Sequence, residues 1–178
     1  FIPVVINWNS DDLFNTLNNS TEILRSISLY DVHFTPRIHL KNEYLKSGAN
    51  RVIELDWYYR SGYLDNNEGN NKLNAIYFAG NQSKRRLEII NKLDYEKVFV
   101  SGSGWKSRKI KNLGYLGLGG MHTNFKNYFI NLNILTKENN DTSNLRNFEI
   151  PAYMGFQISE RTEKIQSLFE EDKEIVLF

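Results

Sequence analysis

Short apolar runs alternate with longer polar stretches along the chain. Val, Ile, Leu and aromatic residues dominate eight runs, at 1–7, 30–35, 51–57, 73–79, 97–100, 130–135, 155–159 and 174–178. Runs of this length and composition predict β-strands. The stretches at 37–46, 84–93, 121–129 and 160–169 predict helices between them. Strands that alternate with helices predict an α/β fold with a parallel, doubly wound sheet.

Residues 62–71 are polar, rich in Asn and without periodicity, which predicts a hinge between two domains. We therefore expect residues 1–61 to be the C-terminal part of a first domain and residues 72–178 to form a second. The chain starts at Phe1, within an expected strand, and stops directly after another. We expect it to be a fragment of a longer protein whose first domain is partial and whose second is truncated at its end.

Composition excludes several classes of site. The 178 residues include no Cys and three His, which excludes disulfides, a Cys nucleophile and thiolate metal sites. The net charge of +1 gives no electrostatic case for a nucleic-acid partner. No apolar run reaches the roughly 18 residues of a transmembrane segment, and no signal peptide is visible, so we expect a cytoplasmic location.

The most informative stretch is 131–156, which reads as a strand, a polar loop at 137–144 and a helix. The loop is expected at the surface, and Asn144 or Ser143 can cap the helix that follows. Arg146 and Glu149 then share one helical face. A helix start with Arg and Glu suits a phosphate and a pair of sugar hydroxyls. The alternative is a surface ion pair, worth at most about 0.5 kcal/mol.

A second candidate lies after the strand 73–79, where Gly80 opens a turn into a helix. Arg85 and Arg86 fall in the first helical turn, where positive charge opposes the helix dipole unless an anion is bound. This conflict indicates a diphosphate site, and the alternative is a solvated basic face. Gly102 and Gly104 permit close backbone approach or positive φ.

Two common nucleotide motifs are absent. A dinucleotide fingerprint fails at Gly102 and Gly104, because the third glycine position is Ser107. It fails again at 117–122, where the third position is His122, a residue with no visible partner. There is no P-loop motif. Trp105 is either a flank for a nucleobase or a packing residue.

The sequence motif RNFEIPA at residues 146–152, after the strand LNI, resembles a motif of the CgeB-type (spore-maturation) glycosyltransferases. Segments near the start, including YDVHFTPR at 30–37, resemble the end of that family's N-terminal, acceptor-side domain. The resemblance implies the GT-B fold, with two Rossmann-like domains and a nucleotide-sugar donor. It implies that Glu149 holds the ribose, that Gly80 and Arg85 or Arg86 face the donor phosphates, and that Trp105 flanks the base. The family carries a small segment where this chain has Tyr153 and Met154, which places donor specificity in question.

Catalytic residues are harder to nominate. Asp11 and Asp12 follow the first strand, the usual ligand position in an open α/β sheet, but Asp11 also suits a cap for a helix at 13–18. His33 lies within a strand and suits a buried structural position, and His39 suits a solvated helix. Asp12 and His33 are therefore weak catalytic candidates.

The sequence thus predicts a metal-independent glycosyltransferase fragment with Gly80, Arg85, Arg86, Trp105, Asn144, Arg146 and Glu149 as donor-binding residues. Its partners would be a nucleotide-diphosphate-sugar and a glycan, protein or small-molecule acceptor, with no resident cofactor or metal. The alternatives are a non-catalytic nucleotide-sugar or phospholigand-binding module and an assembly protein of a spore or cell-surface layer.

Overall fold

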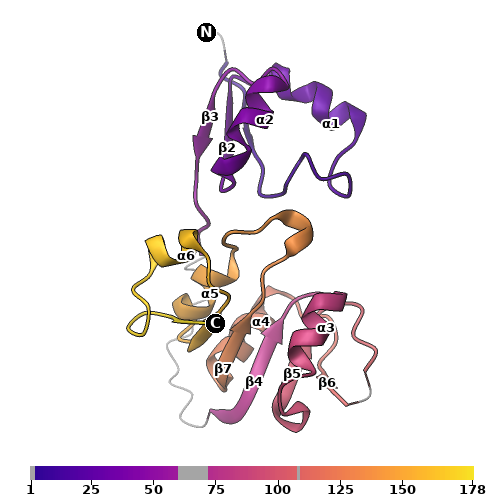
Figure 1. The fold of residues 1–178 in the computed structure, drawn as a ribbon, viewed down its shortest axis with the longest axis vertical. Helices are drawn as coiled ribbons and strands as arrows, with labels where there is room; N and C mark the ends of the chain where they lie inside the picture. The colour runs from indigo at the N-terminus through magenta and orange to yellow at the C-terminus, as the bar shows by residue number, and fades with distance from the viewer. Residues whose placement is uncertain (1–2, 60–71, 108) are drawn as a thin grey trace. The chain divides into compact units, whose positions relative to one another are not determined.

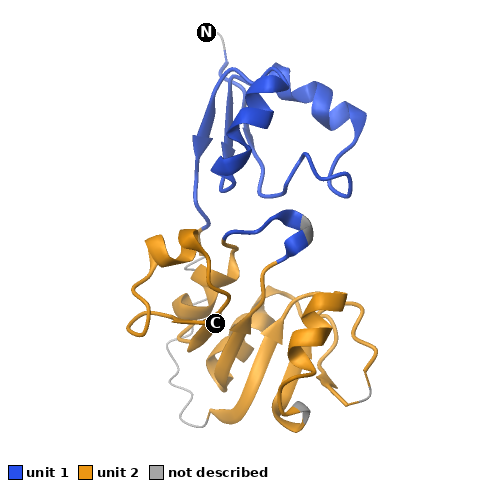
Figure 2. Cartoon of the chain, in the orientation of Figure 1, with its two compact units in different colours: residues 1–57, 136–142 blue, residues 58–135, 143–178 orange. Residues whose placement is uncertain are grey.

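The computed structural model describes residues 3–59, 72–107 and 109–178, and the chain divides into two compact units. Figure 2 distinguishes unit 1, residues 1–57 with 136–142, from unit 2, residues 58–135 with 143–178. The chain therefore passes from one unit to the other three times. The expected hinge at 62–71 lies outside the described residues.

Unit 1 contains a three-stranded, all-parallel sheet in the order β1-β2-β3. Its strands are β1 (Ile6–Trp8), β2 (Val32–Thr35) and β3 (Val52–Glu54), and its helices are α1 (Thr21–Ser26), η1 (Ile27–Leu29), η2 (Ile38–Leu40) and α2 (Lys41–Lys46). A small core joins these helices to one face of the sheet. Leu13, Ile27, Leu40, Tyr44, Ala49 and Val52 form that core.

The helix expected at 13–18 is wrong, because those residues form turns and the first helix starts later, at Thr21. The side chain of Asp12 accepts hydrogen bonds from the backbone N–H groups of Phe14 and Asn15, at 2.9 and 3.2 Å. Such Asp and Asn side chains stabilise turns in competition with a helix. The true helix start is capped by Ser20, whose hydroxyl accepts from the N–H of Ile23.

Unit 2 contains a six-stranded, all-parallel sheet in the order β6-β5-β4-β7-β8-β9 (Figure 1). Its strands are β4 (Leu73–Ala79), β5 (Val98–Ser101), β6 (Lys111–Asn112), β7 (Tyr128–Asn133), β8 (Gln157–Ser159) and β9 (Val176–Leu177). Numbered from the first strand of the unit, this order is 3-2-1-4-5-6. This is the Rossmann-like order: successive strands are added on one side of β4, and from β7 onward they are added on its other side. The expected parallel α/β fold is confirmed.

Helices cover both faces of this sheet. The helical elements of unit 2 are α3 (Lys84–Ile90), η4 (Tyr95–Lys97), α4 (Leu118–Asn127), α5 (Arg146–Ala152) and α6 (Glu163–Leu168). Helix α3 packs against one face through Ile90, which contacts a core containing Phe78 and Val100. Helices α4 and α5 pack on the other face, where Phe125 and Ile150 join a core built on Tyr77. Parallel sheets require this double cover, because both faces are apolar.

The central strand β7 carries two buried amides on its polar positions. Asn131 is fully buried, and its Nδ2 donates to the carbonyl oxygens of Phe125 and Phe156, at 2.9 and 3.2 Å. Asn133 exchanges two 3.1 Å hydrogen bonds with the side chain of Asn144. These bonds pair the Nδ2 group of Asn131 and the side chain of Asn133, and they link β7 to helix α4, which precedes it, and to the segments on both sides of α5, which follows it.

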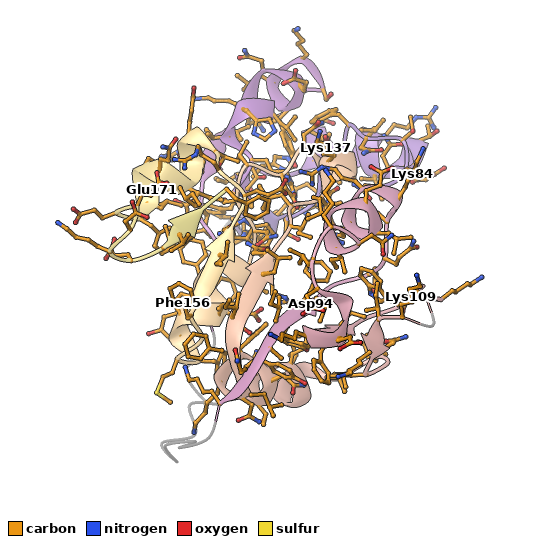
Figure 3. All side chains as sticks on the ribbon, turned by 60° about the horizontal axis from the view of Figure 1, so that its bottom comes forward. Lys84, Asp94, Lys109, Lys137, Phe156 and Glu171 are labelled. Carbon is orange, nitrogen blue, oxygen red and sulfur yellow. The ribbon has the colours of Figure 1, made fainter. Side chains whose placement is uncertain are left out.

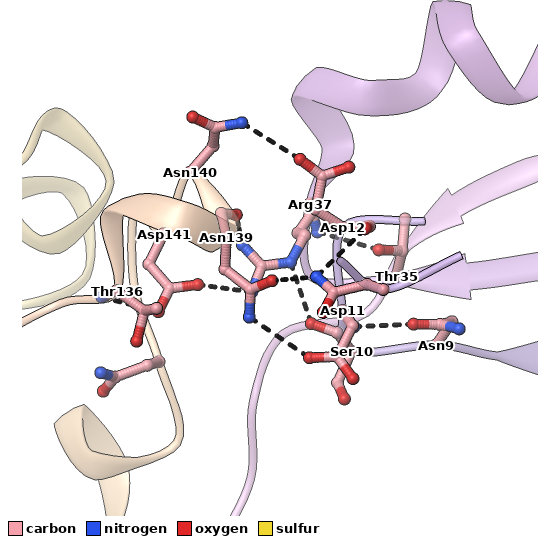
Figure 4. Close-up of polar contacts among 12 residues, drawn as sticks. Asn9, Ser10, Asp11, Asp12, Thr35, Arg37, Thr136, Asn139, Asn140 and Asp141 are labelled. Carbon is pink, nitrogen blue, oxygen red and sulfur yellow. Dashed lines mark hydrogen bonds and ion pairs between the residues drawn. The ribbon is translucent and has the colours of Figure 1, made fainter. Parts of the chain in front are cut away.

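The polar loop after β7 belongs to unit 1 and contains η5 (Lys137–Asn139). Figure 4 shows its contacts with the carboxyl ends of β1 and β2. The Arg37 guanidinium, 3% exposed, donates to the carbonyl oxygen of Asn139 at 2.7 Å and pairs with Asp141 at 2.5 Å. The expected surface loop is thus partly wrong, because the Asp141 side chain is buried beside Arg37.

Candidate functional site

A cavity of about 230 Å³ opens in unit 2 at the carboxyl ends of β4 and β5. This edge of a parallel sheet is where ligands bind in open α/β folds. The strand ends, the segment before α4, helix α4 and the first residue of α5 all contribute to the wall. The lining residues are Gly80, Asn81, Ser101, Gly102, Tyr115, Leu116, Leu118, Met121 and Arg146.

Glycine is required where two segments of the wall meet. The N–H of Gly80 donates to the carbonyl oxygen of Ser101 at 2.8 Å, and the next residue, Gly102, has φ of +129°. A Cβ added at Gly102 would lie 2.3 Å from the carbonyl oxygen of Gly80. The expected close backbone approach at Gly102 is therefore present, and it keeps side-chain atoms out of this part of the wall.

Arg146 places a positive charge on the cavity. It is the first residue of α5, and the Asn144 side chain accepts a hydrogen bond from its backbone N–H at 3.1 Å. Its guanidinium pairs with the carboxylate of Glu149, three residues later. The sequence left open a phosphate site or a surface ion pair. The pair is present but not at the surface, because the Glu149 side chain is 6% exposed and Arg146 lines the cavity.

Glu149 is held from its other side by helix α4. The Nε2 atom of His122 lies 3.4 Å from Oε1 of Glu149, and Arg146 contacts Oε2. The carboxylate thus links α5 to α4. Burial lowers the pKa of His122, and the hydrogen bond to Glu149 opposes that shift.

The amino end of α4 also reaches the cavity, since Leu118 and Met121 are among its lining residues. The first N–H groups of a helix have no partners within the helix and carry the positive end of its dipole. Together with Arg146 they make the cavity suited to an anion.

Arg85 and Arg86 stand elsewhere on the same edge of the sheet. Arg86 donates to the carbonyl oxygens of Asn81 and Ile134, at 3.0 and 2.9 Å, and so bridges the ends of β4 and β7. Arg85 pairs with Glu160 and donates to the carbonyl oxygen of Leu135. Backbone carbonyl oxygens and the Glu160 carboxylate are thus the observed partners of the two arginines, for which the sequence predicts a diphosphate. Neither arginine lines the cavity.

Trp105 and Asn144 support the walls. Trp105 is 7% exposed and packs edge-on against Phe78, while its indole Nε1–H donates to the carbonyl oxygen of Gly80 at 2.8 Å. Asn144 joins the start of α5 to β7 through Asn133. Of the seven nominated donor-binding residues, Gly80 and Arg146 therefore share the cavity wall, and Glu149 contacts Arg146.

The two catalytic candidates lie in unit 1 and make structural contacts. Besides its turn hydrogen bonds, Asp12 accepts from the side-chain amide of Asn140 at 3.1 Å. His33 is 1% exposed, and its Nε2 lies 2.8 Å from the carbonyl oxygen of Ile27. The expected interior position of His33 is confirmed. The catalytic nomination of Asp12 and His33 stays a prediction.

Sequence reasoning missed most of the apolar wall and the role of His122. Tyr115, Leu116 and Leu118 follow β6, a two-residue strand within a stretch that reads as a basic loop. The glycines at 117, 119 and 120 are the sequence signal of this segment, although their spacing does not fit a dinucleotide fingerprint. No sequence pattern indicates the contact between His122 and Glu149, since the two residues are 27 positions apart.

In residues 3–59, 72–107 and 109–178, no group of three or more His, Cys, Asp or Glu side chains is placed to hold a metal ion. Within the same ranges, every helix is too short or too polar to cross a membrane.

Comparison with known proteins identifies a family. A sequence profile described as glycosyl transferase-like matches residues 83–178, which is more than half of the chain. The matched region runs from the start of α3 to β9 and includes Arg146 and Glu149. The two parallel, Rossmann-like sheets are consistent with the domains of GT-B glycosyltransferases. No curated protein sequence matches the chain closely enough to provide a second comparison. The chain therefore belongs to the glycosyl transferase-like family.

Proposed function

We propose that the chain carries the donor site of a glycosyltransferase that moves a sugar from a nucleotide-diphosphate-sugar to an acceptor. The observation that carries the proposal is the position of Arg146, on the wall of a cavity at the carboxyl edge of a Rossmann-like sheet. Family membership supplies the reaction class. The finer assignment to the CgeB-type enzymes rests on the sequence motif RNFEIPA at residues 146–152.

The size of the cavity limits what it holds. Pockets that enclose a drug-sized ligand usually measure about 300–1,000 Å³, whereas this cavity measures about 230 Å³. We assign to it the diphosphate and the adjoining ribose. The base and the transferred sugar would lie outside the cavity.

Arg146 and the amino end of α4 would hold the diphosphate. During transfer, the bond between the anomeric carbon and the phosphate oxygen breaks, and negative charge grows on the departing nucleoside diphosphate. Fixed positive groups lower the energy of that transition state without rearrangement. The planar guanidinium of Arg146 fits two phosphate oxygens at once.

Glu149 has two roles in this proposal. Its carboxylate fixes Arg146 beside the cavity, and it accepts hydrogen bonds from the two ribose hydroxyls once Arg146 has turned toward the phosphate. An ionised carboxylate offers about four acceptor positions, enough for these partners and His122. Gly80 would let the backbone approach the ligand, while Trp105, Asn144, Arg85 and Arg86 would hold the surrounding strand ends.

The remaining assignments follow from the resemblance. Residues 1–61 would come from the acceptor-side domain and residues 72–178 would form the donor-binding domain. Transfer would proceed without a metal ion and in the cytoplasm. The acceptor would be a glycan, a protein or a small molecule.

Calorimetric titration with UDP, GDP and dTDP tests the donor site. We expect one of them to bind, and Arg146→Ala and Glu149→Ala to weaken that binding about tenfold or more, as expected for a lost charge-assisted hydrogen bond. The matched control is Glu163→Ala, since Glu163 is an exposed acidic residue in the first turn of α6.

Equal effects of Glu149→Ala and Glu163→Ala would remove Glu149 from the site. Failure of all three nucleotides to bind at millimolar concentration would contradict the donor site itself. Binding without release of the nucleoside diphosphate from the matching nucleotide sugar would identify a binding module rather than an enzyme.

A further inference from the structure

The carboxylate of Glu149 is shared between two groups that can carry positive charge. Arg146 contacts one oxygen from the cavity side, and His122 approaches the other at 3.4 Å. Both Glu149 and His122 are 5% exposed. A change in the charge of His122 therefore acts on Glu149 with little screening by water.

The ring of His122 is fixed by an aromatic neighbour. The rings of His122 and Tyr153 stack with centroids 3.7 Å apart and an angle of 11° between their planes, and Tyr153 is 4% exposed. Tyr153 is also where the chain departs from the small segment expected in the CgeB-type enzymes. This stack connects that departure to the Arg146–Glu149 pair.

The surroundings of His122 favour its uncharged imidazole. Burial lowers the pKa of His122 below its ordinary value of 6.5, the hydrogen bond and charge of Glu149 oppose this, and the charge of Arg146 adds to it. Polar or charged atoms of Glu149, Arg146 and Tyr153 face or approach the ring. Behind them on β4, Tyr77 stays uncharged because burial raises its pKa.

We propose that His122 is a positioning residue for the donor phosphate, because it sets how strongly the Glu149 carboxylate competes with the phosphate for the Arg146 guanidinium. This inference rests on the proposed function. Neutral His122 donates one hydrogen bond to Glu149 and leaves most of the carboxylate's charge to Arg146. Protonated His122 takes a larger share of that charge, and Arg146 is then freer to bind phosphate.

The direction in which pH changes the affinity for an anion follows from the sharing of the Glu149 carboxylate between His122 and Arg146. An anion in the cavity offsets the positive charge of Arg146, which otherwise disfavours imidazolium, so binding raises the pKa of His122. A ligand that raises a pKa binds more tightly as the group becomes protonated. The pKa of His122 is then higher in the bound protein than in the free protein. Affinity for the anion should therefore rise as the pH falls through the interval between these two pKa values.

UDP affinity measured at about pH 5.5 and about pH 8 tests this, with His122→Gln as the variant that keeps an N–H donor but does not titrate. Titration of UDP itself affects both proteins equally and cancels in the comparison. We expect the ratio of affinities at the two pH values to be about three- to tenfold larger for the unmodified protein, which corresponds to a pKa change of about 0.5–1. The control is His39→Gln, because His39 is exposed and lies in unit 1. Equal ratios for the unmodified protein and His122→Gln would overturn the proposal.

Histidine NMR separates this inference from the donor site. With three His in the chain, the His122 signal is assigned by its loss in the variant. We expect Arg146→Gln to raise the pKa of His122 without any ligand, and UDP to raise it in the unmodified protein. If none of UDP, GDP and dTDP binds, the proposed function fails, and the Arg146→Gln measurement alone decides the link. An unchanged pKa of His122 in Arg146→Gln would then reject the link between His122 and Arg146.

Discussion

Arg85, Arg86 and Arg146, at the carboxyl edge of the sheet in unit 2, differ in the groups that they contact. Arg86 donates to two backbone carbonyl oxygens, Arg85 pairs with Glu160, and Arg146 pairs with Glu149 beside a cavity. An arginine bound to strand-end carbonyl oxygens stabilises the fold, whereas one beside a cavity can bind a ligand. The residue type alone does not separate these roles.

Replacement of Arg86 should therefore affect stability. Arg86→Ala leaves the carbonyl oxygens of Asn81 and Ile134 without its two hydrogen bonds, and it exposes the Phe78 ring beneath the guanidinium. We expect the free energy of unfolding to fall by about 1–3 kcal/mol, measured by urea denaturation. Lys84→Ala is the matched control, because Lys84 is exposed in the same helical turn, and Figure 3 shows its position on α3. A loss for Arg86→Ala no greater than for Lys84→Ala would contradict the structural role.

The sequence could indicate Arg146 and Glu149 because their relation is local. A spacing of three residues places two side chains on one helical face regardless of the rest of the fold. The partners of Arg85 and Arg86 depend instead on where β7 and β8 end, at residues about 50 to 75 positions away. Positive charge near the helix start led to the prediction of a diphosphate, whereas the structure shows carbonyl oxygens and a carboxylate beside the two arginines.

At the scale of elements, periodicity located every described strand of unit 2 except β6, and it described the polar loops less well. The expected strand at 73–79 matches β4 at both ends, whereas no strand was expected at β6. The loop at 137–144 was expected at the surface because its residues are polar, yet Asn140 and Asp141 contact complementary groups on Asp12 and Arg37. Local composition cannot reveal a partner such as Arg37, about 100 residues away.

The loop should become accessible when Arg37 is removed. Asp141 would keep a buried charge without its cation, which typically costs about 3–5 kcal/mol. In Arg37→Ala we expect unit 1 to lose stability and trypsin to cleave after the exposed Lys137 several times faster. Arg25→Ala serves as the control, since Arg25 is exposed in α1. Equal rates of cleavage after Lys137 in the two variants would show that the Arg37–Asp141 pair does not hold the loop.

At the scale of the whole molecule, the alternation of strands and helices was sufficient to predict the parallel α/β arrangement, and the family resemblance added two Rossmann-like domains. It was not sufficient to predict that unit 1 is built from two separate segments of the chain. It also did not predict where on the carboxyl edge the cavity lies. Gly80 and Gly102 mark that place only after β4 and β5 are known to be neighbours.

The central claim is that the donor diphosphate binds in the cavity beside Arg146. A crystal structure of the chain with the nucleoside diphosphate that binds most tightly tests this most directly. The account predicts phosphate density within hydrogen-bonding distance of the Arg146 guanidinium and next to the backbone of Gly80 and Gly102. Phosphate density at Arg85 and Arg86, with the cavity beside Arg146 empty, would contradict it.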